Sequence, residues 1–110
     1  MQTTLKKRLE IVIEAPVLDR LARVFDNRSS GFTVIPALTG RGTHGVWSRA
    51  GEIGDAGRMV VLFAIIDPGE LDETLEAVYK VVSRQIGIVS VSDVHVVRDD
   101  HFRGAGKPAS

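Results

Sequence analysis

Hydrophobic residues in this chain follow one order twice: a strand pattern, a helical pattern and a further strand pattern. Apolar and polar residues alternate over residues 8–15, and this period of two predicts a strand with one face against a core. Pro16 follows at the first helical position, where a missing N–H costs nothing. The apolar residues after it have the i, i+3, i+4, i+7 spacing of a helix with one buried stripe: Leu18, Leu21, Ala22 and Phe25.

The first unit closes with a predicted strand at residues 32–38, in which Pro36 cannot donate a ladder hydrogen bond and therefore indicates an edge or a bulge. The second unit opens with a continuous apolar run at residues 58–66, which predicts a strand buried on both faces. Asp67 stands before a proline and is expected to cap the second helix. Residues 86–98 are expected to form the last strand.

This order predicts an α+β fold of the ferredoxin-like βαββαβ type, a sandwich of one four-stranded antiparallel sheet with two helices on one face. Because the helices cover only one face, the other face is left with apolar residues, and we expect it to contact further subunits. A chain of 110 residues is expected to form a single domain. We place that domain at residues 1–98, with a long loop at 40–57, and expect residues 99–110 to be a mobile C-terminal tail.

Composition excludes several classes of function. The chain has no cysteine, which rules out disulfides, thiolate zinc sites and cysteine nucleophiles. Its 14 basic and 14 acidic residues leave no net positive charge for nucleic-acid binding. The longest apolar run, Met59–Ile66, is far shorter than the roughly 20 residues that cross a bilayer, and the N-terminus lacks an apolar signal segment. We therefore expect a cytoplasmic protein without direct membrane insertion.

The loop at 40–57 is the most informative segment for function. It holds six of the 11 glycines together with His44, Trp47 and two arginines. Glycines leave backbone N–H groups accessible, and arginines present fixed forks to carboxylate, carbonate or phosphate, so the loop is typical of a flap that closes on an anion. A flexible connection without function is the alternative. Trp47 predicts a protein contact or a lid over a ligand, with local packing as its alternative.

Three motifs in order resemble the PII signalling proteins. They are Gly31-Phe32-Thr33-Val34, then Gly40-Arg41-Gly42, and, after the long loop, the apolar strand Met59-Val60-Val61-Leu62-Phe63. The resemblance extends from residue 8 to about residue 98. It implies a homotrimer that binds adenine nucleotides in three clefts between neighbouring subunits.

The resemblance also implies which residues bind the nucleotide. Thr33 would lie near the adenine or ribose, and Ile65 would form the cleft wall. The other candidates occupy the base of the loop, the turn before the last strand and the end of that strand: Gly40, Arg41, Gly42, Ser83, Arg84, Gln85, Gly87 and Arg98. Strand packing is the alternative role for Thr33 and Ile65.

The phosphate positions depart from the family pattern. The family's phosphate loop usually reads Thr-Gly-x-x-Gly-Asp-Gly-Lys, whereas residues 83–90 retain Gly87 and have no lysine. Arg98 matches the first of the family's two phosphate arginines, and Asp100 stands where the second would be. Because each lost cation weakens the hold on the outermost phosphate most, we expect ADP or AMP to bind in preference to ATP.

The loop also indicates a branch of the family. It has no tyrosine between residues 40 and 57, so uridylylation is not expected. The arginine-bearing loop resembles the PII-like proteins of inorganic-carbon metabolism, and the absence of a terminal cysteine pair favours the carboxysome-associated type over the type associated with a bicarbonate transporter. This implies bicarbonate as a second ligand, held by Arg41, Arg49 and Arg58, and a bicarbonate transporter or a carboxysome-related protein as partner. Trp47 is the candidate partner contact.

Two other functions stay open at this point. Ferredoxin-like folds include small enzymes such as cofactor-free monooxygenases, and metal-tolerance trimers have a similar architecture. No catalytic arrangement stands out, and the three histidines lack the spacing of a metal site. We therefore expect a binding protein that needs no cofactor or metal rather than an enzyme, with slow hydrolysis of bound nucleotide left open.

Overall fold

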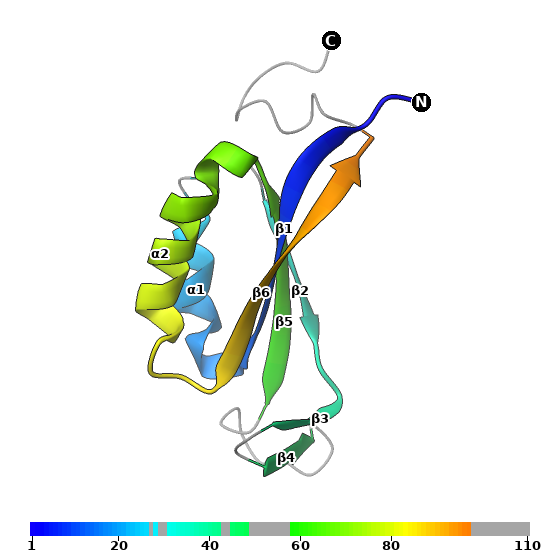
Figure 1. Cartoon of the computed structure of the whole chain (residues 1–110). Helices are drawn as coiled ribbons and strands as arrows, with labels where there is room; N and C mark the ends of the chain where they lie inside the picture. The colour runs from blue at the N-terminus through cyan, green and yellow to red at the C-terminus, as the bar shows by residue number, and fades with distance from the viewer. Residues whose placement is uncertain (27, 29–30, 43–44, 49–57, 98–110) are drawn as a thin grey trace.

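A computed structural model describes residues 1–26, 28, 31–42, 45–48 and 58–97. Two helices lie side by side on one face of a four-stranded antiparallel sheet, and a small hairpin lies beyond one end of that sheet (Figure 1). The strands are β1 (Thr4–Glu14), β2 (Phe32–Pro36), β3 (Thr39–Gly42), β4 (Gly45–Ser48), β5 (Met59–Ile66) and β6 (Gly87–Val96). The helices are α1 (Leu18–Val24) and α2 (Leu71–Val82), each preceded by a 3-10 turn, Ala15–Val17 and Pro68–Glu70.

The sheet has the order β2-β5-β1-β6, with every neighbouring pair antiparallel. This confirms the predicted α+β arrangement of four strands and two helices. Pro36 lies in β2 at the edge of the sheet, as its missing N–H requires. Among the described residues, no helix is long and apolar enough to cross a membrane.

The core lies between the sheet and the helices. In β1 the predicted alternation holds, because Leu9, Ile11 and Ile13 are fully buried while the residues between them are half-buried. Leu21 of α1 and Val78 of α2 pack into the same core. Each of these aliphatic side chains contributes about 1.5–3 kcal/mol by leaving water, so the helical layer is held mainly by this stripe.

The prediction that β5 is buried on both faces was wrong for one of the two faces. Its helix-facing residues are buried, but Val61, Phe63 and Ile65 on the other face are only half-buried. The reason is that the described residues form no second layer on that side. We call this side, where these three residues lie, the open face.

Four apolar residues cross the open face in one row. Ile35 pairs with Val61, Val61 with Val12, and Val12 with Ile88, so the row runs over all four strands. Ile35 and Ile88 are exposed at its two ends. We call these four residues the apolar row.

Asp67 stands at the N-cap position with Pro68 after it, as predicted, but it does not cap the helix through its side chain. Its side chain makes no capping hydrogen bond, and its carboxylate instead pairs with the ammonium of Lys6, which is nearly buried. The register explains the change, because Lys7 opposes Ile66 and the next residues outward are Lys6 and Asp67. A buried ammonium needs a charged or polar partner far more than the helix end needs a cap.

The sequence pattern predicts no regular structure in the 40–57 loop, yet its first part forms a hairpin. Strands β3 and β4 pair from Thr39 opposite Ser48 to Gly42 opposite Gly45. A hairpin is held by backbone hydrogen bonds, so glycine-rich strands can pair without the apolar alternation by which strands are recognised. Residues 49–57 of the loop lie outside the described residues.

Candidate functional site

Two of the predicted nucleotide-binding residues lie together in a pocket of about 300 Å³. We call it the β2–β5 pocket, after the strands that supply most of its wall. Thr33 and Ile65 both line it, as the resemblance implies. Its lining among the described residues is Arg8, Gly31, Phe32, Thr33, Phe63, Ala64 and Ile65.

Strand register places these residues. Thr33 opposes Phe63 in the β2–β5 ladder, so Thr33, Phe63 and Ile65 all point to the open face. Phe32 points to the opposite face, where its ring lies 5.8 Å from the ring of Phe25 at the end of α1. This aromatic contact fixes the start of β2 against the helical layer and so fixes the pocket wall.

Arg8 is a pocket residue that the sequence analysis missed. It opposes Ile65 in the β1–β5 ladder, and its guanidinium carbon lies 4.3 Å from the centre of the Phe63 ring. Its Nη1 also donates to Oε1 of Glu10 at 3.3 Å. Both side chains are about one-third exposed, so the ion pair itself contributes little stability. The ring and the carboxylate together hold a cation at the pocket wall, where it can meet an electron-rich or anionic ligand.

A second group of predicted residues lines a pocket of about 450 Å³ at the other end of the molecule. Ser83, Arg84 and Gln85 lie in the turn between α2 and β6, and all three line this pocket. We call it the helix-end pocket. Its other lining residues are Arg20, Tyr79, Lys80 and Val81, which come from α1 and α2.

Gly87 has a clear structural role beside this turn. A Cβ on Gly87 would lie 2.5 Å from the carbonyl oxygen of Val12, so only glycine fits where β6 begins against β1. The turn is also held by Glu14, whose Oε1 accepts a hydrogen bond from the backbone N–H of Ile86 at 3.2 Å. A role of Gly87 in phosphate binding stays a prediction.

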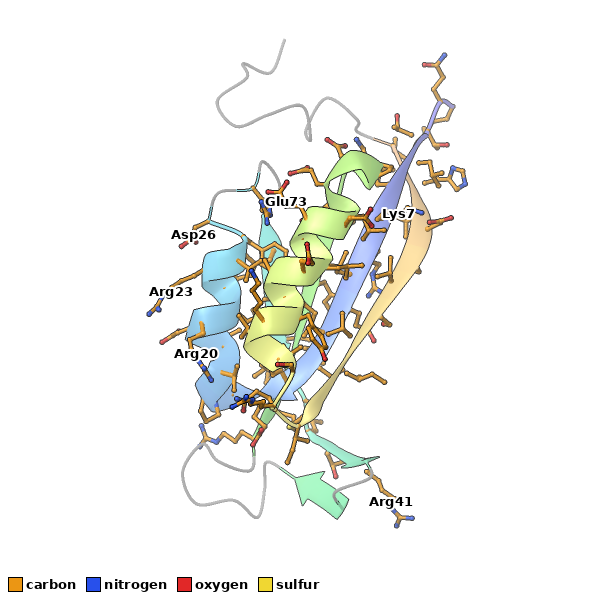
Figure 2. The ribbon with its side chains drawn as sticks, turned by 60° about the vertical axis from the view of Figure 1, so that its left-hand side comes forward. Lys7, Arg20, Arg23, Asp26, Arg41 and Glu73 are labelled. Atoms are coloured by element: carbon orange, nitrogen blue, oxygen red, sulfur yellow. The ribbon has the colours of Figure 1, made fainter. Side chains whose placement is uncertain are left out.

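The loop candidates lie near the same end. Gly40, Arg41 and Gly42 lie in β3, and Arg41 is exposed on the hairpin (Figure 2). Arg58 is half-buried just before β5, and its carbonyl accepts a hydrogen bond from the N–H of Ala15 at 2.9 Å. The backbone of Trp47 lies opposite Gly40 in the hairpin.

Two predicted residues, Arg49 and Arg98, lie outside the described residues. Their assignment to anion and phosphate binding therefore stays a prediction. Among the described residues, no group of three His, Cys, Asp or Glu residues could hold a metal ion.

Within one chain, the two groups of candidate nucleotide-binding residues lie far apart. Thr33 is level with Ser90 across the sheet, three strands away, and Gly87 lies three residues farther along β6. Standard strand spacing and rise put Thr33 and Gly87 roughly 17 Å apart, on opposite edges of the sheet. Candidate base-binding and phosphate-binding residues thus occupy different edges of one molecule.

Comparison with known families shows to which family the chain belongs. The model of the family described as "Nitrogen regulatory protein P-II" matches residues 6–101. The chain belongs to the P-II family. The match includes both pockets, the hairpin and the two outlying arginines.

Solved structures confirm the P-II fold. CPII, a nitrogen regulatory PII-like protein from Thiomonas intermedia K12, is similar in a form bound to ADP, AMP and bicarbonate, with 22% identity, a TM-score of 0.83, and coverage of 92% of this chain and 96% of CPII. Its form bound to ADP and bicarbonate is 26% identical, with a TM-score of 0.79 and coverage of 93% and 98%. A PII-like signalling protein from Thermus thermophilus is 22% identical, with a TM-score of 0.75 and coverage of 93% and 99%. No curated protein sequence matches the chain.

Proposed function

We propose that this P-II family member is a homotrimeric regulatory protein that binds ADP or AMP in clefts between subunits. The observation that carries the proposal is the separation of the candidate residues onto two edges of one chain. Thr33 and Ile65 would supply one side of a cleft, and the loop base with residues 83–87 of a neighbouring copy would supply the other. A site divided in this way is completed only by assembly.

The open face is the surface through which we propose that copies assemble. The apolar row gives it a continuous hydrophobic strip, while polar residues flank the strip along β1 and β6. Burying such a strip favours association by about 25 cal/mol for each Å² removed from water. Because the β2–β5 pocket lies on the same face, assembly would bring a neighbouring subunit close to it.

Ligand preference is proposed from the phosphate positions. The turn at residues 83–90 has no lysine, and Asp100 replaces a family arginine, so the charge available to the outermost phosphate is reduced. CPII is bound to ADP and AMP in one of its structures, which is consistent with a preference for the shorter nucleotides. We assign the protein to ligand binding rather than to enzyme catalysis.

We further propose that the 40–57 loop senses bicarbonate and signals to a partner in inorganic-carbon metabolism. Arg41, Arg49 and Arg58 are the proposed bicarbonate-binding residues, and Trp47 is the proposed partner contact. Support comes from the exposed position of Arg41 on the hairpin and from bicarbonate in the CPII structures. The carboxysome-associated type stays the preferred branch, and a carboxysome-related protein or a bicarbonate transporter is the proposed partner.

Isothermal titration calorimetry of the full chain tests the ligand preference. We expect ADP or AMP to bind more tightly than ATP, and bicarbonate to change ADP affinity because the two ligands share the loop. ATP binding tenfold tighter than ADP binding would contradict the preference. An ADP affinity that does not respond to bicarbonate would contradict the proposed coupling.

Native mass spectrometry tests the assembly. Val61→Glu places a charge in the apolar row, and we expect it to abolish the trimer and ADP binding together. Val97→Glu is the control, because Val97 is exposed and lies outside the row. A monomeric wild-type protein that still binds ADP would show that the cleft is not shared between subunits.

A further inference from the structure

Arg28 lies between the end of α1 and the start of β2, and most of its side chain is buried. Only 13% of that side chain is exposed, whereas its partner Glu73, in the first turn of α2, is 76% exposed. Nη1 of Arg28 donates to Oε1 of Glu73 at 2.9 Å. This ion pair joins the connection after α1 to the start of α2, at the end of the helical layer where Asp26 also lies (Figure 2).

Stability alone does not explain why a guanidinium group is placed here. Burying a charged group costs free energy unless ion pairs and hydrogen bonds compensate for the lost water. Nη1 has its carboxylate, but Nε of Arg28 is buried and has no hydrogen-bond partner among the described residues. Because the partner carboxylate is mostly in water, the ion pair adds little to the free energy of unfolding. The guanidinium is therefore better explained by what its ion pair holds in place.

In the sequence, Arg28 stands between the core and the wall of the β2–β5 pocket. Its backbone N–H donates to the carbonyl of Phe25 at 3.1 Å, and Phe25 is buried in the core. Gly31 follows three residues later and lines the pocket together with Phe32 and Thr33. In the described sheet, β2 is an edge strand with β5 as its one neighbour, so its start needs a further contact to be held firmly.

We propose that Arg28 is a positioning residue for the β2–β5 pocket and acts through its ion pair with Glu73. This role rests on the proposed function, in which the pocket forms one side of the nucleotide cleft. The ion pair holds the chain on α2 just before β2, and so keeps Gly31 and Thr33 where they form the pocket wall. Arg28 does not line the pocket, so it affects a ligand only through the backbone that follows it.

Hydrogen exchange of the ligand-free full chain tests the positioning directly. Glu73→Gln removes the charge of the exposed partner and keeps the shape of its side chain, so the protein should still fold. We expect the backbone amides of residues 32–35 to exchange about threefold faster, because a weak ion pair is lost while the contact between the Phe25 and Phe32 rings remains. Exchange in β1, at the centre of the sheet, should not change.

Glu76→Gln is the matched control for this experiment. Glu76 is exposed on the same helix, one turn after Glu73, and makes no ion pair with another described residue. The substitution removes the same charge from the same surface. We expect wild-type exchange rates in residues 32–35 of this variant.

Calorimetric titration with ADP shows whether the position of β2 matters to the ligand. We expect ADP affinity to fall about threefold in Glu73→Gln and to stay at the wild-type value in Glu76→Gln. Arg28→Lys keeps a cation that can pair with Glu73, whereas Arg28→Met keeps only an unbranched side chain of similar length. Tighter ADP binding by Arg28→Lys than by Arg28→Met would separate the ion pair from packing of the side-chain stem.

Four results would overturn the proposal. In the first, residues 32–35 of Glu73→Gln exchange at the wild-type rate, or no faster than in Glu76→Gln. In the second, exchange in β1 rises equally, because the ion pair would then stabilise the whole fold. In the third, β2 exchanges faster but ADP affinity is unchanged. In the fourth, Arg28→Met binds ADP as tightly as Arg28→Lys.

Failure of the proposed function gives a different result. A wild-type protein that binds no ADP would contradict the proposed nucleotide cleft. The exchange rates of residues 32–35 in Glu73→Gln and Glu76→Gln would then decide by themselves whether Arg28 holds the pocket wall.

Discussion

The two pockets differ in how their cations are held. In the β2–β5 pocket, Arg8 lies against the Phe63 ring and is paired with Glu10, so its position is set before any ligand arrives. In the helix-end pocket, Arg20, Lys80 and Arg84 are brought together by packing and turn geometry, and no carboxylate of the described residues lines the space. The comparison shows that one small fold can offer a cationic wall held in place on its sheet and a cationic cluster, without carboxylates among its described lining residues, on its helices.

We expect the largest difference between the two regions when a glycine in each is replaced by alanine, because their backbones are packed with very different closeness. Gly87→Ala would place a Cβ 2.5 Å from a backbone oxygen, so β6 must shift and we expect a loss of about 2–3 kcal/mol in the free energy of unfolding. In the β2–β5 pocket, a Cβ added by Gly31→Ala would meet no atom within 4 Å. This substitution should therefore change the free energy of unfolding by less than about 0.5 kcal/mol. Urea denaturation measures both. Equal losses would show that the close approach at Gly87 is relieved without cost.

The next largest effect on the free energy of unfolding is expected from breaking an ion pair that contains a nearly buried charge. Asp67→Ala removes a partner of the nearly buried Lys6, two residues along β1 from Arg8, and we expect a loss of about 1–2 kcal/mol in unfolding free energy. Asp93→Ala breaks the more exposed pair with Lys7 and should cost less than about 0.5 kcal/mol. Thermal unfolding at low salt compares the two variants. A larger loss for Asp93→Ala would mean that burial does not set the strength of these pairs.

Arg8 tests whether the sheet pocket is a binding wall. Arg8→Ala removes the cation but leaves Thr33 and Ile65 in place, and we expect ADP affinity to fall about fivefold. Arg8→Lys should recover part of the loss, since it restores the charge without the planar group that lies over Phe63. Fluorescence titration with a labelled ADP measures the series. ADP affinity equal in all three proteins would exclude Arg8 from the cleft.

Salt concentration should give the smallest difference. The helix-end cations repel one another, so raising salt from low to about 0.15 M should stabilise that region slightly by screening. Hydrogen exchange of the backbone amides at the end of α2 and in the following turn should slow, by a factor of about two. Amides of β5 near Arg8, whose charge is already paired, should not change. If salt slowed amide exchange in β5 more than at the end of α2, the uncompensated charge would lie on the sheet instead.

Local patterns were sufficient to predict the order of the four sheet strands and the two helices. The period-two alternation in β1 identified its buried face, and Pro36 predicted an edge strand because the missing N–H is a property of that residue alone. The ordered glycine and threonine motifs likewise indicated the P-II family, which the family match over residues 6–101 confirms. These inferences depend only on residues close together in the chain.

Tertiary structure decided which distant residues meet. A period of two tells which face a side chain occupies but not which residue opposes it, so the contacts of Arg8 with Phe63 and of Lys6 with Asp67 required the register of β1 and β5. The meeting of Arg20 with residues 79–85 depended in the same way on how two helices pack. The hairpin escaped prediction because backbone pairing leaves no apolar pattern in glycine-rich strands. Contacts between segments distant in sequence are set by the global packing, and no local pattern encodes them.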